Sequence, residues 1–130
     1  MESVKKFFKW AGIVLLALIV ISLVYSILGM DDVLKVQIED VDMADIADGI
    51  YVGSYDNYRW SNMVEVTVTG HQITSIEPLK IQNGGEDIVR DLTARILERQ
   101  MPNVDAVSGA TASSNGFLKA VETALKSAAK

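Results

Sequence analysis

An uncharged apolar segment near the N-terminus constrains this chain more than any other feature. Residues 10–30 carry no formal charge, and a helix of this length reaches about 31 Å at about 1.5 Å per residue. The hydrocarbon core of a bilayer is about 30 Å thick. Because the segment is apolar all round rather than striped, the buried core helix of a soluble domain is a weaker alternative. We therefore expect residues 1–30 to form a membrane anchor.

The residues flanking this segment predict its orientation. Three lysines precede it and Asp31 and Asp32 follow it; the lysines are Lys5, Lys6 and Lys9. Positive residues beside a spanning helix favour the cytoplasmic side. We expect a single-pass cell-membrane protein in contact with membrane lipid, with its N-terminus cytoplasmic and its domain extracytoplasmic. A cleaved signal peptide is the alternative, but its apolar region is usually only about 7–15 residues long.

Composition limits the chemistry available to the chain. Most of the 130 residues lie outside the anchor, which is enough for one small domain. The absence of cysteine excludes disulfides, thiolate metal sites and cysteine nucleophiles, and a single histidine, His71, cannot form a zinc-binding pair. Residues 31–130 hold 9 basic and 16 acidic residues, and this negative charge disfavours nucleic acid as a partner.

The segment after the anchor differs from the rest of the chain. Residues 31–47 are acidic, with scattered aliphatic side chains that match neither helical nor strand periodicity. We predict an acidic tether with some local structure there. Residues 48–130 then form a single domain, which opens with a turn signal at Asp48-Gly49 followed by residues that favour a strand.

Alternating side chains predict a small antiparallel sheet. Residues 63–69 alternate apolar and polar positions, as a half-buried strand does. Gly70-His71 fits a tight two-residue turn into a returning strand over residues 72–79. Alternation is lost near Thr74, which predicts a bulge, and Pro78 favours an edge strand.

Two amphipathic helices are predicted after the sheet. The first opens with Glu86, where a carboxylate suits the helix dipole, and ends before Pro102. The second begins near Ser113 and buries a stripe of apolar residues, while polar residues point to water; the stripe is Phe117, Leu118, Val121 and Leu125, and the polar residues are Lys119, Glu122 and Lys126. The predicted fold class is α+β: an N-terminal transmembrane helix followed by a small antiparallel sheet covered by two helices.

A hydroxyl-rich loop separates these two helices. Residues 105–114 read Asp-Ala-Val-Ser-Gly-Ala-Thr-Ala-Ser-Ser. The start of a helix offers free N–H groups to an anion, and the hydroxyls add side-chain donors. Alternatively, Ser113 or Ser114 simply caps the last helix. A cluster of aromatic residues before the second strand can stack on a flat heterocycle or fill the core; it comprises Tyr51, Tyr55, Tyr58 and Trp60.

The loop also resembles a known attachment motif. Asp105, then Ser108-Gly109-Ala110-Thr111, then Ser113-Ser114 is similar to the motif of the FMN-binding domain family. That domain occurs in G-type subunits of Rnf electron-transport complexes, in the C subunit of the sodium-pumping NADH:quinone reductase, and in small stand-alone membrane-linked flavoproteins. The opening Asp48-Gly49-Ile50-Tyr51-Val52-Gly53 resembles the family's DGxYxG sequence. The likeness runs from Asp48 to Leu125, and is greatest to the stand-alone members.

The resemblance implies a cofactor and roles for the loop residues. In covalent members the last threonine of the motif carries FMN through a phosphoester, and Thr111 matches it. A separate flavin transferase makes that bond. Ser108, Gly109, Ala110 and Ser113 are then expected to bind the cofactor phosphate with Thr111, whereas Asp105 is expected to be recognised by the transferase. No metal site is predicted.

The implied function is electron transfer at the membrane. We expect a membrane-anchored extracytoplasmic flavoprotein electron carrier with a membrane redox partner, rather than an enzyme with its own substrate turnover. Two alternatives stay open. One is a module that binds FMN without a covalent bond, and the other is a cofactor-free interaction subunit of a membrane assembly.

Overall fold

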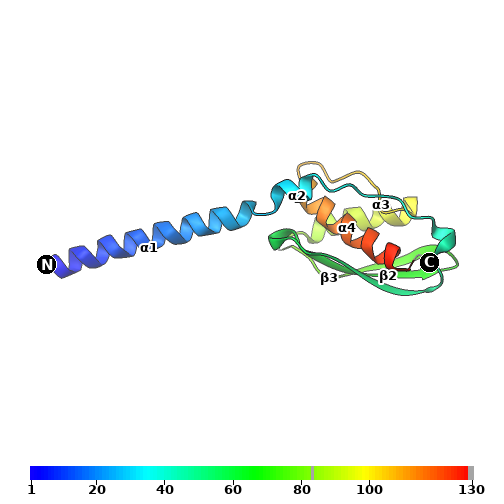
Figure 1. Ribbon diagram of the computed structural model, residues 1–130, viewed down its shortest axis with the longest axis horizontal. Coiled ribbons are helices and arrows are strands. Elements are labelled where there is room, and N and C mark those ends of the chain that lie inside the picture. Colours follow the sequence, from blue (N-terminus) through cyan, green and yellow to red (C-terminus); the bar gives the residue numbers. More distant parts are fainter. Residues whose placement is uncertain (83, 129–130) are drawn as a thin grey trace.

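The chain consists of a long N-terminal helix and a small α+β domain (Figure 1). The computed structural model describes residues 1–82 and 84–128. The elements in chain order are α1 (Glu2–Ile27), α2 (Met30–Leu34), η1 (Met43–Asp45), β1 (Gly49–Tyr55), η2 (Tyr58–Trp60), β2 (Asn62–Thr69), β3 (Gln72–Lys80), α3 (Glu86–Arg99) and α4 (Thr111–Ala128). The predicted α+β class, with an apolar helix, an antiparallel sheet and two helices in that order, is confirmed.

Helix α1 projects away from the domain (Figure 1). None of its residues is buried, and within the described residues the chain has one helix long and apolar enough to cross a membrane. After α1 the backbone turns at Gly29, whose φ of 77° lies in the left-handed region that favours glycine. A helix is therefore present over Glu2–Ile27 of the predicted anchor, while its insertion in a membrane and its orientation there stay predictions.

The sheet has the order β1-β2-β3 and is antiparallel throughout. Gly70 and His71 both have φ of 61°, which is the geometry of the predicted two-residue turn. Thr67 pairs with Ser75 and Val68 with Ile73, so the predicted bulge falls on Thr74, between them. Strand β3 is an edge strand, as Pro78 indicated.

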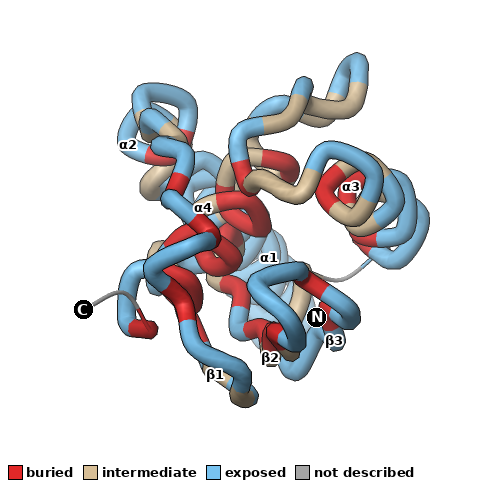
Figure 2. Tube along the Cα trace, turned by 90° about the vertical axis from the view of Figure 1, so that its right-hand side faces the viewer, coloured by how far each residue is buried: buried red, intermediate tan, exposed pale blue. Residues whose placement is uncertain are grey.

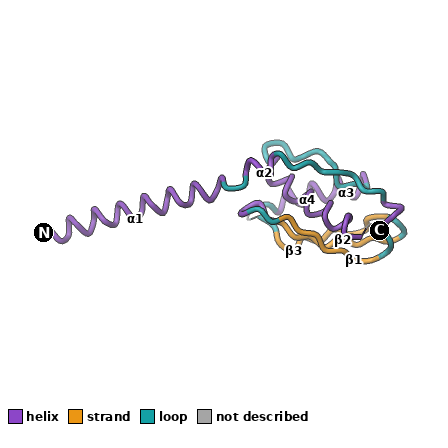
Figure 3. Tube along the Cα trace, in the orientation of Figure 1, coloured by secondary structure: helices purple, strands orange, loops and turns teal. Residues whose placement is uncertain are grey.

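Both long helices of the domain cover the same face of this sheet (Figure 3). Helix α4 packs on β1 and β2, and α3 packs on β3 and α4. Figure 2 shows the buried residues concentrated between α4 and the sheet. The fully buried side chains at this contact come from β2 and α4: Val64, Val66, Phe117, Val121 and Leu125. The apolar stripe predicted for the last helix therefore forms the centre of the core.

The segment predicted as an acidic tether packs along α4 (Figure 1). Val33 and Ile46 are fully buried, and Ile46 and Met43 belong to the main hydrophobic core. Asn115 Nδ2 donates to Val33 O at 3.0 Å. The scattered aliphatic residues of this segment are thus spaced by the irregular path of the chain over the domain, which explains why they follow no single period.

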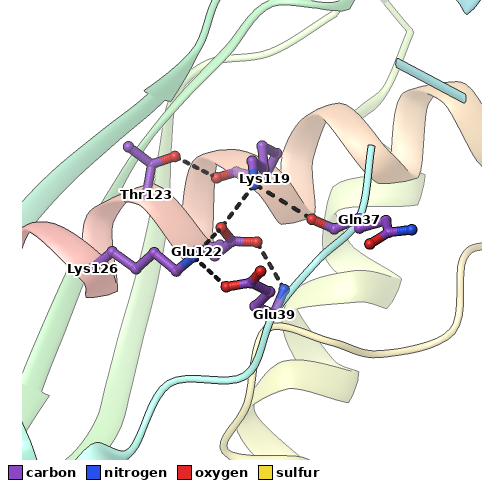
Figure 4. Close-up of polar contacts among 6 residues, drawn as sticks. All are labelled: Gln37, Glu39, Lys119, Glu122, Thr123 and Lys126. Carbon is purple, nitrogen blue, oxygen red and sulfur yellow. Dashed lines mark hydrogen bonds and ion pairs between the residues drawn. The ribbon is translucent and has the colours of Figure 1, made fainter. Parts of the chain in front are cut away.

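Glu122 is buried, in contrast to the prediction that it points to water. It is 1% exposed, and Figure 4 shows its carboxylate among cationic and backbone donors. Lys119 Nζ and Lys126 Nζ lie 2.8 and 3.1 Å from Glu122 Oε1. Glu39 N donates to Glu122 Oε2 at 2.9 Å, so this carboxylate joins the segment before β1 to α4.

This carboxylate makes the stability of the domain sensitive to acid. Burial raises the pKa of Glu122, but hydrogen bonds from Lys119, the Glu39 N–H and Lys126 outweigh burial and lower the pKa below its ordinary value. A lowered pKa in the folded state means that the ionised form stabilises the fold above the unfolded pKa of about 4.3. The stabilisation is lost as pH falls through the folded pKa.

We therefore expect Glu122→Gln to lower stability at pH 7 by about 1.5–3 kcal/mol, the usual contribution of a hydrogen bond to a charged group. The variant should then lose less stability than the wild-type chain between pH 5 and pH 3. Thermal unfolding of both full chains in detergent micelles at stepped pH measures this difference. If both chains lost the same amount of stability between pH 5 and pH 3, the assigned role of Glu122 would be contradicted.

Candidate functional site

The loop before α4 leads into a helix start without a side-chain cap. Ala110 N donates to Val107 O at 2.9 Å, and the first bond of α4 runs from Ser114 N to Ala110 O at 2.9 Å. Ala110 therefore occupies the N-cap position, where its methyl group offers no oxygen to the N–H groups of the first turn. Those N–H groups and the helix dipole favour an anion there.

The two serines considered as caps have other roles. Because α4 begins at Thr111, Ser113 and Ser114 lie inside its first turn. Ser114 is fully buried, and its Oγ accepts from Val107 N at 3.0 Å. Ser113 Oγ donates to Gln82 Oε1 at 2.7 Å. These hydroxyls hold the loop and the segment after β3 against the start of α4.

A glycine and an arginine fix the path of the loop. Gly109 has φ of 78°, a conformation that costs other residues about 1–2 kcal/mol. A Cβ at this position would meet no atom within 4 Å, so the space beside the backbone is open. Arg95 Nη1 donates to Asp105 O at 2.7 Å, which joins the start of the loop to α3.

A hollow of about 540 Å³ lies at the start of α4. We call it the attachment hollow, and its lining residues are Met30, Leu34, Arg59, Trp60, Ile88, Gly109, Ala110, Thr111, Ala112 and Ser113. Its volume falls in the range of about 300–1,000 Å³ that is typical of small-molecule sites. Thr111 is exposed, so another protein can reach its hydroxyl. Four predicted site residues, Gly109, Ala110, Thr111 and Ser113, therefore line one cavity.

The other two predicted site residues lie elsewhere. Asp105 and Ser108 line a separate hollow with side chains of α3, including Arg95 and Arg99. The structure does not bring Ser108 into the attachment hollow, so its expected contact with a phosphate stays a prediction. The exposure of Asp105 leaves its side chain accessible to a protein partner.

Trp60 provides an aromatic wall to the attachment hollow. It is 5% exposed, and its Nε1 has no hydrogen-bond partner among the described residues. The guanidinium carbon of Arg59 lies 4.4 Å from the Trp60 ring centroid, a cation–π contact. Of the other clustered aromatics, Tyr51 and Tyr55 pack on the core, and Tyr58 is exposed against Tyr25 of α1. Tyr51 and Tyr55 therefore help to fill the core, whereas stacking of this cluster on a flat heterocycle stays a prediction.

Sequence reasoning missed several lining residues. Met30 falls within the predicted anchor, Leu34 within the predicted tether and Ile88 within the first predicted helix of the domain. Only tertiary packing brings these segments to the loop, so no local pattern marks them. The only local indication of this part of the site was a cation next to an aromatic residue, Arg59 and Trp60. Among the described residues no group of three or more His, Asp or Glu side chains is arranged to hold a metal ion.

Fold and site together define a protein with an open helix N-terminus beside an aromatic-walled cavity, which suits a phosphorylated aromatic cofactor. The model of the FMN-binding domain family matches residues 60–126, just over half of the chain. The chain belongs to this family, which confirms the resemblance found in the sequence, and its membership supports a flavin-binding role.

A curated relative is similar to part of this chain. Urocanate reductase of Eggerthella lenta is 43% identical to this chain over 68 residues, which is 48% of this chain and 11% of that protein. The chain thus matches only a small part of that relative. The reductase activity named for that protein is therefore not carried over to this chain.

Proposed function

We propose that this protein is a membrane-anchored extracytoplasmic electron carrier with FMN attached covalently through a phosphoester to Thr111. The observation that carries this proposal is the position of the Thr111 hydroxyl. It is exposed on the first residue of α4, in the wall of the attachment hollow and beside uncapped N–H groups. A flavin-binding role is supported by the family membership.

The attachment step needs a flavin transferase and FAD. The Thr111 oxygen forms a bond to the phosphorus of the FMN half of FAD, the bond between the two phosphates breaks, and AMP leaves. The hydroxyl proton passes to a base of the transferase or to water. Asp105, exposed at the start of the loop, is proposed as a contact for the transferase, because a carboxylate beside the phosphate would repel it.

The loop holds the phosphate once the ester exists. The N–H groups at the start of α4 face the remaining negative charge, and the open space at Gly109 lets a phosphate approach the backbone. Ser108 is proposed as a further donor, and so is Ser113 once its hydroxyl turns from Gln82 to the phosphate. The buried Trp60 side chain, which lines the attachment hollow, is proposed as the wall beside which the isoalloxazine ring lies. Bound FMN supplies one- and two-electron chemistry, while the chain supplies position and electrostatics.

Membrane anchoring gives the covalent bond a physical reason. With the lysines before α1 in the cytoplasm, the domain faces a large dilute compartment. A cofactor released there is lost by mass action unless its Kd is very low. A phosphoester removes that requirement. We propose a flavin transferase, a membrane redox partner and membrane lipid as the partners.

The test uses the full chain co-expressed with an active flavin transferase. We expect an increase in intact mass equal to FMN minus one water, and flavin fluorescence that stays with the protein on a denaturing gel. Unchanged mass with active transferase and FAD would contradict the covalent bond. Yellow colour that is lost on denaturation and filtration would then favour non-covalent FMN. A colourless protein that co-purifies with stoichiometric partners would favour an interaction subunit.

A further inference from the structure

A second hollow lies where α1 meets the domain. It has a volume of about 450 Å³, and we call it the junction groove. Its lining residues come from the last turns of α1, from the region of η2 and from the end of β3: Ser22, Tyr25, Ser26, Tyr58, Arg59, Ser61, Lys80, Ile81 and Gln82. It is a separate cavity from the attachment hollow, although Arg59 lines both.

The junction groove is positively charged on an acidic domain. Its lining includes two cations, Arg59 and Lys80, and no carboxylate. Within the described residues neither cation forms an ion pair with Asp or Glu. Five lining residues carry hydroxyl groups. Those of Ser26 and Ser61 already donate to backbone carbonyls, while those of Ser22, Tyr25 and Tyr58 add hydrogen-bond donors. Two unpaired cations with hydroxyls around them suit a phosphate, since Arg binds phosphate oxygens in pairs and Lys adds a point charge.

The position of the groove points to a phosphate carried by a lipid. Ser22, Tyr25 and Ser26 belong to the last turns of an apolar helix, none of whose residues is buried. If α1 spans the bilayer, these turns lie at the level of the headgroups, where aromatic residues such as Tyr25 are enriched. A headgroup phosphate beside α1 is then within reach of the groove without leaving the membrane.

We propose that the junction groove binds the phosphate of an anionic phospholipid, which holds the domain in a fixed position against the membrane surface. The proposal rests on the membrane anchoring proposed above. Arg59 Nη1 already lies 3.5 Å from Ser26 O, and Asn57 Nδ2 donates to Gly29 O at 2.8 Å, so the groove closes between α1 and the domain. Arg59 and Lys80 hold the lipid phosphate from the domain side, and Ser22 and Tyr25 line the groove from the α1 side.

The test is native mass spectrometry of the full chain released from detergent micelles. Phosphatidylglycerol and phosphatidylcholine with identical acyl chains are added at equal concentration. We expect the chain to retain one molecule of phosphatidylglycerol roughly tenfold more often than one of phosphatidylcholine. Each cation near an anionic lipid raises its affinity several-fold. Lys80→Gln should reduce the preference roughly fivefold. Arg90→Gln, an equal charge change on exposed α3, should leave it intact.

The outcomes separate this proposal from its alternatives. Equal retention of both lipids, or equal effects of Lys80→Gln and Arg90→Gln, would overturn it. Displacement of the lipid by millimolar inorganic phosphate would also overturn it, by showing a site for free phosphate. Vesicle flotation tests the anchoring separately: a chain that does not float with vesicles refutes the anchor itself, whereas one that floats without lipid preference refutes only the groove. Lys80 lies outside the attachment hollow, so flavin incorporation should be unchanged in its variant.

Discussion

Replacing Thr111 by valine is expected to abolish covalent flavin attachment completely, whereas Thr111→Ser retains it. Valine has nearly the shape of threonine but lacks the oxygen that becomes the ester, and serine keeps that oxygen. Thr111 is exposed on the first residue of α4, so neither change disturbs the core. Intact mass and in-gel flavin fluorescence after co-expression with the transferase measure the attached fraction, and thermal unfolding checks the fold.

Two neighbouring hydroxyls provide matched controls for this result. Ser113→Ala removes the bond to Gln82 and should lower the rate of flavin attachment without preventing it. Ser108→Ala, in a separate hollow, should have the smaller effect of the two. Covalent flavin on the Thr111→Val chain would show that a different hydroxyl is the acceptor. Non-covalent yellow colour in that variant would instead show that the cavity binds FMN without the ester.

Local patterns were sufficient to predict the sheet. The alternation along β2, the turn at Gly70-His71 and the bulge at Thr74 each depend on neighbouring residues or on one adjacent strand. The same is true of Pro78, because its missing N–H restricts it to a strand edge whatever lies above the sheet. Features set by two or three successive residues can therefore be read directly from the sequence.

The environment of Glu122 could not be predicted in this way. Its position beside the apolar stripe of α4 looks like a helix flank, and a carboxylate is normally solvated. Its burial depends on Lys119 and Lys126 one turn away on either side, which the sequence shows, and on the backbone N–H of Glu39, which it does not. Only the path of residues 31–47 over α4 supplies that third partner.

The residues of the candidate site also fall into two groups, those close in sequence and those brought together only by tertiary packing. Gly109, Ala110, Thr111 and Ser113 are close in sequence and necessarily stay close around a helix start, so a motif could identify them. Their partners in the attachment hollow come from α2, η2 and α3, and no periodicity connects those segments. A motif cannot predict on which side of the loop a residue lies. Ser108 is next to Gly109 in sequence, yet it lines the separate hollow beside α3.

Replacing Gly53 by alanine is expected to destabilise the domain by about 3 kcal/mol or more. Gly53 is buried on β1 beneath α4. A Cβ there would overlap the Ala120 carbonyl oxygen and the Ala124 amide nitrogen, which are backbone atoms that cannot rotate away. Relief requires α4 to move off the sheet, and overpacking of this kind costs about 1–3 kcal/mol or more.

Thermal unfolding of the full chain in detergent micelles measures the effect. For a domain of this size each kcal/mol lowers Tm by about 4–8 °C, so Gly53→Ala should lower Tm by about 12 °C or more. Gly12→Ala is the matched control, because a Cβ at Gly12 on α1 meets no atom within 4 Å. An unchanged Tm for Gly53→Ala would mean that α4 does not rest on β1 at this point. The start of α4 carries Thr111, so the same contact also sets where the hydroxyl proposed as the flavin acceptor lies relative to the sheet.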